Sequence, residues 1–243
     1  MAVNQAQPHP QRTETRLTFA GRSFCAALDQ TIWGAATLGR RFSKSARARQ
    51  RGVEVIKNVP YRLGQSIDHR LDVYRTEHGP PTGRPAMLYI HGGGFALCSK
   101  DTHWSLALEC ARLGFVVFNI NYRRSSKHPF PAAINDAILA LRWVLAQGDR
   151  FGADPRRMVI AGESAGGNLT TALAVACSYR LKHRPARALF DTGFMPKAFI
   201  AACPVLQISA RGWSTSTAAA LPRCLPTLSM TLASVTRPVK ASQ

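Results

Sequence analysis

Acidic residues are scarce in this 243-residue chain, in which 13 Asp and Glu stand against 32 Lys and Arg for a formal net charge of +19. An excess of this size raises nucleic acid or an anionic membrane as a partner. The basic residues are spread along the whole chain, mostly as arginine, without a lysine-rich run or interleaved aromatic residues. We therefore expect no nucleic-acid partner.

Three other features are missing. The six cysteines form no Cys-x-x-Cys pair and no zinc-ligand spacing, so we expect reduced thiols and no metal site. No apolar window reaches the ~18–20 residues of a membrane span. The polar start of the chain, residues 1–11, lacks the charged and apolar regions of a signal peptide, which favours a cytoplasmic location.

What the chain does contain is an alternation of buried strands and helices in its middle part. Polar-apolar alternation at 53–59 and 70–75 predicts two half-exposed strands at an antiparallel edge. Apolar runs predict strands at 86–90, 115–122, 158–161 and 197–206, and helical spacing predicts helices at 102–113 and 131–147. The pattern predicts an α/β fold, a mostly parallel sheet with helices on both faces.

Residues 162–166 read Gly-Glu-Ser-Ala-Gly, between an apolar strand and an Ala- and Leu-rich segment that favours a helix. A serine becomes a useful nucleophile when a sharp strand-to-helix turn lifts its hydroxyl out of the sheet. Such a turn crowds the backbone, which explains the small residues Gly162 and Gly166. The five residues alone are equally compatible with an ordinary glycine-rich turn.

A second motif, His91-Gly92-Gly93-Gly94, follows the strand predicted at 86–90. Consecutive glycines have no Cβ and let backbone N–H groups approach a bound oxygen. Two such donors, with the N–H of the residue after the serine, would surround the oxyanion of a tetrahedral intermediate. Alone the loop would be a flexible turn, but the two motifs together predict Ser164 as a nucleophile.

Further matching residues are Asn121-Tyr122-Arg123, the segment 128–132, Asp136 and the continuation Gly167-Asn168. With these motifs the chain resembles the hormone-sensitive-lipase-like α/β-hydrolases, a group of esterases and lipases, over about residues 53–209. The resemblance implies an α/β-hydrolase fold, carboxylic-ester substrates and no metal or organic cofactor. It assigns the nucleophile to Ser164, the oxyanion N–H groups to Gly93, Gly94 and Ala165, and structural support to His91, Gly92, Gly162, Glu163 and Gly166.

The residues after Ser164 depart from this family. A serine esterase of this fold places an acid and then a histidine after the nucleophile, yet here His183 precedes Asp191, and no other acid or histidine follows Ser164. We expect neither residue to serve Ser164. The chain is therefore expected to be an impaired ester hydrolase, incomplete at its C-terminal end, with a non-catalytic ligand-binding protein on the same scaffold as the alternative.

Two segments flank the predicted core of 53–209. Residues 1–52 contain an amphipathic pattern over 19–42 followed by basic residues, which fits either a cap helix over the acyl pocket or a helix on a lipid surface; we favour the cap. Residues 210–243 contain no Asp, Glu or His and are expected to be disordered, non-family sequence. A frameshift or truncation near residue 209 would explain this tail, and a divergent interaction segment is the alternative.

Overall fold

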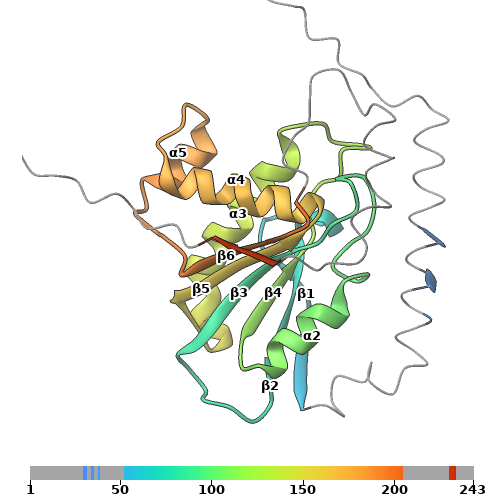
Figure 1. The fold of residues 1–243 in the computed structure, drawn as a ribbon. Coiled ribbons are helices and arrows are strands. Elements are labelled where there is room, and N and C mark those ends of the chain that lie inside the picture. Colours follow the sequence, from blue (N-terminus) through green and yellow to red (C-terminus); the bar gives the residue numbers. More distant parts are fainter. Residues whose placement is uncertain (1–29, 32–33, 36–37, 39–51, 205–229, 234–243) are drawn as a thin grey trace, which may run out of the picture.

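A twisted sheet forms the centre of the molecule (Figure 1). The computed structural model describes residues 30–31, 34–35, 38, 52–204 and 230–233. Within these residues the sheet has seven strands in the order β1-β2-β4-β3-β5-β6-β7. The strands are β1 Val53–Pro60, β2 Arg70–Thr76, β3 Arg84–Ile90, β4 Val116–Ile120, β5 Ala153–Glu163, β6 Ala198–Ala202 and β7 Met230–Ala233.

Four central strands, β4, β3, β5 and β6, pair in parallel, and β1, β2 and β7 pair antiparallel to their neighbours. The predicted antiparallel edge is thus confirmed at β1 and β2. Because parallel strands end on the same side of a sheet, the carboxyl ends of β3 and β5 bring Ile90 opposite Gly162. The loops that follow these two strands therefore start side by side.

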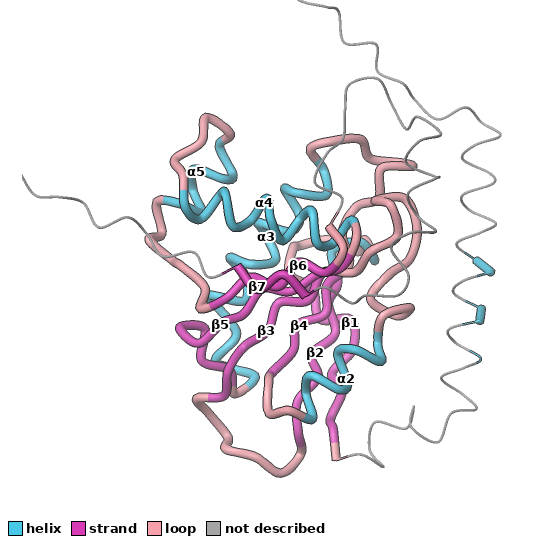
Figure 2. The backbone as a smooth tube through the Cα atoms, in the orientation of Figure 1, coloured by secondary structure: helices cyan, strands magenta, loops and turns pink. Residues whose placement is uncertain are grey.

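Helices cover both faces of the sheet (Figure 2). On one face α4 packs against β3, β5 and β6, and α3 packs against β3 and β4. On the other face α2 packs against β2 and β4. Alternation along β3 explains this, since Leu88 and Ile90 belong to the core under α3 and α4, whereas Tyr89 belongs to the core under α2. The helical elements are η3 Ile67–His69, α2 Trp104–Arg112, α3 Ala132–Gln147, η4 Gly148–Phe151, α4 Ala165–Ser178 and α5 Arg184–Phe190.

Two local expectations, for β2 and for the tail, were wrong. β2 is not half-exposed, because it lies between β1 and β4 and its residues from Leu71 to Tyr74 are buried. A short helix that the sequence did not predict, α5, lies between His183 and Asp191 and packs against α3 and α4. The tail, expected to lack strands, supplies β7, which pairs with the open edge of β6 because an unpaired edge offers a full row of backbone donors and acceptors.

The flanking segments lie almost entirely outside the described residues. In the N-terminal segment the five described residues are helical, in agreement with a helix over 19–42, and they are exposed. The role of that helix and the nature of the tail remain predictions. No helix among the described residues is long and apolar enough to cross a membrane.

Candidate active site

Ser164 occupies the single residue between β5 and α4, as the strand-to-helix motif predicts. Its backbone has φ 50° and ψ −115°, a region that L-residues with a side chain rarely adopt and that costs energy to maintain. The Ser164 N–H donates to the carbonyl of Ala202 on β6 at 2.8 Å, and its carbonyl accepts from the N–H of Asn168 at 3.0 Å. Hydrogen bonds therefore fix the turn both to the neighbouring strand β6 and to the start of α4.

Backbone crowding explains why Gly162 and Gly166, on either side of Ser164, have no side chain. A Cβ on Gly162 would overlap the carbonyl oxygen of Gly166, and a Cβ on Gly166 would overlap the carbonyl oxygen of Ile90 at the end of β3. The elbow and the neighbouring strand are thus in backbone contact. This contact accounts for the spacing of the two glycines around Ser164.

The glycine loop after β3 lies directly against this elbow. A Cβ on Gly92 would come within 3.3 Å of Ser164 Cβ. Gly93 and Gly94 have φ values of 109° and 59°, which glycine adopts readily, and their N–H groups donate to no acceptor in the described part of the chain. The N–H of Ala165 is in the first turn of α4, where no intrahelical acceptor exists. The three expected donors are free to bind an oxyanion.

His91 is buried under the glycine loop. Its Nδ1 donates to the carbonyl of Gly92 at 2.7 Å, and its ring stacks on Tyr122 with a centroid distance of 4.4 Å. The Tyr122 hydroxyl donates to the His91 carbonyl at 3.0 Å. Burial lowers the pKa of His91 to about 3, because the imidazolium loses its hydration. The neutral ring of His91 thus contacts the glycine loop and Tyr122, which follows β4, and its structural role stays a prediction.

This burial makes stability depend on pH. An unfolded histidine ionises at its ordinary pKa of 6.5, whereas folded His91 ionises at about 3, so the unfolded chain binds one more proton between these pH values. The free energy of unfolding should therefore fall as the pH is lowered through this window, by up to about 1.4 kcal/mol per pH unit. Urea unfolding of wild type, His91→Asn and the control His183→Asn measures the slope. An unchanged slope in His91→Asn would contradict the prediction.

Glu163 has a partner that the sequence did not reveal. Its Oε1 lies 2.6 Å from Nε2 of His103, the residue that precedes α2. The hydrogen bond from His103 is the main cause that lowers the pKa of Glu163. The carboxylate thus joins the elbow to the loop between β3 and α2. The sequence around His103 does not predict this contact, because Glu163 lies 60 residues later, at the end of β5.

Other family-like residues form a structural network. Asp136 on α3 is buried and accepts hydrogen bonds from the Arg123 guanidinium at 2.8 and 2.9 Å, from the Arg123 N–H at 2.9 Å, and lies 3.3 Å from Nε2 of His69. These contacts tie the segment after β4 to α3. All the printed contacts of Asp136 are thus with residues that join the strand end to α3, and none is with Ser164.

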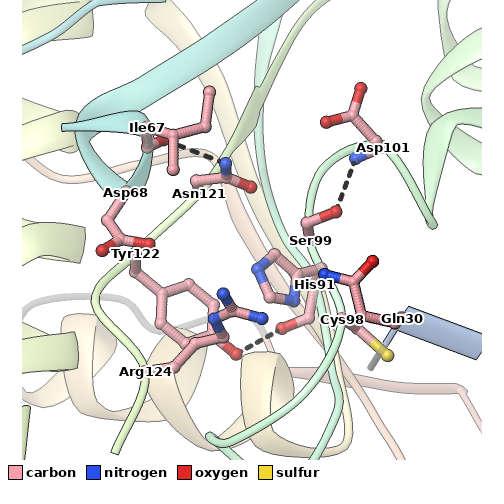
Figure 3. A pocket seen from close by; sticks show the side chains of 10 residues that line it. All are labelled: Gln30, Ile67, Asp68, His91, Cys98, Ser99, Asp101, Asn121, Tyr122 and Arg124. Atoms are coloured by element: carbon pink, nitrogen blue, oxygen red, sulfur yellow. Dashed lines mark hydrogen bonds between the residues drawn. The ribbon is translucent and has the colours of Figure 1, made fainter. Parts of the chain in front are cut away.

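A cavity of about 280 Å³ lies beside the glycine loop (Figure 3). It shares His91 with that loop, but Ser164 does not belong to its wall. Its other lining residues are Gln30, Ile67, Asp68, Cys98, Ser99, Asp101, Asn121, Tyr122 and Arg124.

In the described part of the chain, the contacts of three histidine rings are known, and none of these rings binds Ser164. His69 binds Asp136, and His91 binds the carbonyl of Gly92. The two ring nitrogens of His103 bind Thr102 and Glu163. Asp191 pairs with Arg180 at 3.2 Å at the end of α5, and His183 precedes that helix. Within the described residues no group of His, Cys, Asp or Glu has the arrangement of a metal site.

Sheet order, elbow and glycine loop together are those of the α/β-hydrolase fold. The family model described as "alpha/beta hydrolase fold" matches residues 87–235, more than half of the chain, and the chain belongs to this family. Among relatives, it is 38% identical over 111 residues to the carboxylesterase NlhH of Mycobacterium tuberculosis, covering 44% of this chain and 35% of that protein. It is 37% identical over 118 residues to the ethyl acetate hydrolase of Pseudomonas putida, covering 46% and 36%.

Solved structures agree on the fold. Esterase B from Lactobacillus rhamnosis superposes with a TM-score of 0.54 at 22% identity, covering 67% of this chain and 53% of that chain. The chain spans only about a third of the two curated relatives described above, 35% and 36% of their lengths.

Proposed function

We propose that this chain carries the acyl-transfer site of a serine carboxylic-ester hydrolase, with Ser164 as nucleophile. The observation that carries this proposal is the contact between the elbow and the glycine loop, in which Gly92 lies against Ser164. The free N–H groups of Gly93, Gly94 and Ala165 would stabilise the oxyanion. The names of the relatives support ester substrates, and the proposed reaction requires no metal or organic cofactor.

We further propose that turnover by this chain is slow. An ester is attacked efficiently when a base takes the proton of the serine hydroxyl, and the described histidines with known contacts are engaged elsewhere. An oxyanion hole and binding alone leave roughly a 10³–10⁴-fold acceleration over water. The same observation favours the second candidate function, a ligand-binding protein that does not catalyse hydrolysis.

Hydrolysis of p-nitrophenyl butyrate by the purified chain tests both statements. We expect slow hydrolysis that Ser164→Ala abolishes and that the exposed-loop control Ser125→Ala leaves unchanged. Fast hydrolysis abolished by Ser164→Ala would confirm the nucleophile and refute the impairment. Butyrate-ester binding with no hydrolysis dependent on Ser164 would refute the enzyme and leave the ligand-binding function.

A further inference from the structure

We propose that His103 is a positively charged positioning residue, whose imidazolium holds the glycine loop against the Ser164 elbow through Glu163. The inference rests on the proposed function in so far as the positioned groups serve Ser164. His103 does not touch the reacting atoms. Its role is to keep the loop after β3 against the end of β5. Backbone pairing between these two strands ends at Ile90 and Gly162, so it does not hold the residues that follow.

Hydrogen-bond accounting gives the charge of the ring. The hydroxyl of Thr102 donates to the Ser99 carbonyl at 2.7 Å and accepts from the Ser99 N–H at 3.0 Å. A hydroxyl has one proton and two acceptor positions, so the remaining contact, to Nδ1 of His103 at 2.8 Å, requires a proton on Nδ1. The second acceptor near Nδ1, the Ser99 carbonyl at 3.3 Å, requires the same.

The other ring nitrogen also faces an acceptor. Nε2 lies 2.6 Å from Oε1 of Glu163, and the lowered pKa of Glu163 means that this carboxylate is ionised at neutral pH. An ionised carboxylate only accepts hydrogen bonds, so Nε2 is protonated as well. A short N–H to carboxylate contact of this kind is charge-assisted and stronger than a neutral one. His103 is therefore an imidazolium.

Glu163 also contacts the glycine loop. The N–H of Gly92 also bonds to Glu163, and a Cβ on Gly92 would meet Oε1 of Glu163 at 3.0 Å and Ser164 Cβ at 3.3 Å. The carboxylate thus lies between the His103 ring and the backbone that leads to Gly93. If the charge on His103 is lost, a neutral ring can still donate from Nε2, but the contact is no longer charge-assisted. The weaker contact lets the loop move away from Ser164.

Other titratable groups near the pair do not replace it. Tyr89 and Tyr122 stay neutral because burial raises the pKa of each, and His91, stacked 5.7 Å from His103, stays neutral because burial lowers its pKa to about 3. Lys100 pairs with Asp72 and Asp101. The remaining groups facing this region are Cys98 and Arg124, which act on Tyr122 and His91, and Cys110 of α2, which acts on Tyr89.

The charge can be tested without any reaction at Ser164. In a protein labelled with ¹⁵N-histidine, we expect both ring nitrogens of His103 to carry protons at pH 6.5, assigned with a His103→Gln variant. One bare nitrogen at pH 6.5 would overturn the proposal. This measurement holds even if Ser164 proves unreactive, in which case the proposed function fails by itself.

The positioning role is tested by the rate at which a fluorophosphonate labels Ser164. His103→Gln keeps N–H donors but carries no charge, Glu163→Gln removes the charge of the partner, and His183→Gln is the matched control. We expect labelling about tenfold slower in the first two variants at pH 6.5, as for a misplaced group, and unchanged in the control. Circular dichroism verifies that each variant is folded.

The pH profile distinguishes positioning from a general structural defect. At each pH, the wild-type rate relative to His103→Gln should follow the fraction of His103 that the NMR signal shows with protons on both ring nitrogens. A ratio that stays constant with pH overturns the proposal, as does an equal rate at pH 6.5. A loss of more than about a thousandfold in His103→Gln would also overturn it, because that size indicates a general base.

Discussion

Gly166→Ala is expected to lower the free energy of unfolding by at least about 3 kcal/mol, at the upper end of overpacking effects. Gly166 is within α4, and helix propensity alone would favour alanine by about 1 kcal/mol. The tertiary contact opposes this, because the new Cβ would overlap the Ile90 carbonyl at the end of β3. A rigid backbone on both sides leaves no flexible side chain that could move away.

Gly34→Ala is the matched control, since Gly34 is also helical and a Cβ there meets nothing within 4 Å. Urea unfolding should show this variant to be as stable as wild type or slightly more stable. A Gly166→Ala variant with wild-type stability would show that the elbow and β3 are not in backbone contact. The placement of Ser164 beside the glycine loop, which depends on that contact, would then be wrong too.

Lys100→Met is expected to destabilise the fold by about 3–5 kcal/mol, the usual cost of leaving one partner of a buried ion pair alone. Lys100 Nζ lies 2.9 Å from Asp72 Oδ1, and the two side chains are 1% and 0% exposed. The methylene stem of methionine replaces most of the lysine volume, so the loss is chiefly the uncompensated Asp72 charge. Urea unfolding at neutral pH measures it.

Two variants make this prediction specific. Arg112→Met breaks the pair with Glu109, which is about half-exposed on both sides, and should cost less than about 1 kcal/mol. The double variant Lys100→Met/Asp72→Asn removes both charges while the asparagine oxygen can still accept the Asn58 N–H, so it should recover much of the loss. If the double variant is no more stable than Lys100→Met, the buried charge is not the cause.

Lys100 also matters for the site, because it is on the segment between the glycine loop and α2. Its backbone N–H donates to Asn121 Oδ1 at 2.8 Å, and its carbonyl accepts from Asn119 Nδ2 at 2.9 Å. The segment is thus anchored to β4 and the residues after it. Since His103 follows three residues later, we expect the ion pair with Asp72 to support the His103–Glu163 contact as well.

Much of the fold could be predicted from the sequence. Continuous apolar strands and helical spacing are local signals, and they placed β3, β4, β6, α2 and α3 within a few residues. They found only the C-terminal half of β5, which begins at Ala153. They failed for β2, where polar Asp72 alternates with apolar neighbours but is buried because Lys100 neutralises it. They also failed for α5 and β7, short elements that depend on packing or on an open strand edge.

For the candidate site, the sequence by itself determined the residue types that chemistry and backbone crowding demand: Ser164 between small residues, and glycines after β3. Only the tertiary structure decided how they meet. It placed Gly92 against Ser164, and His103 against Glu163, residues 60 positions apart. The physical reason is that parallel strands far apart in the sequence end at one edge of the sheet, where side chains with no shared local pattern come within hydrogen-bond distance.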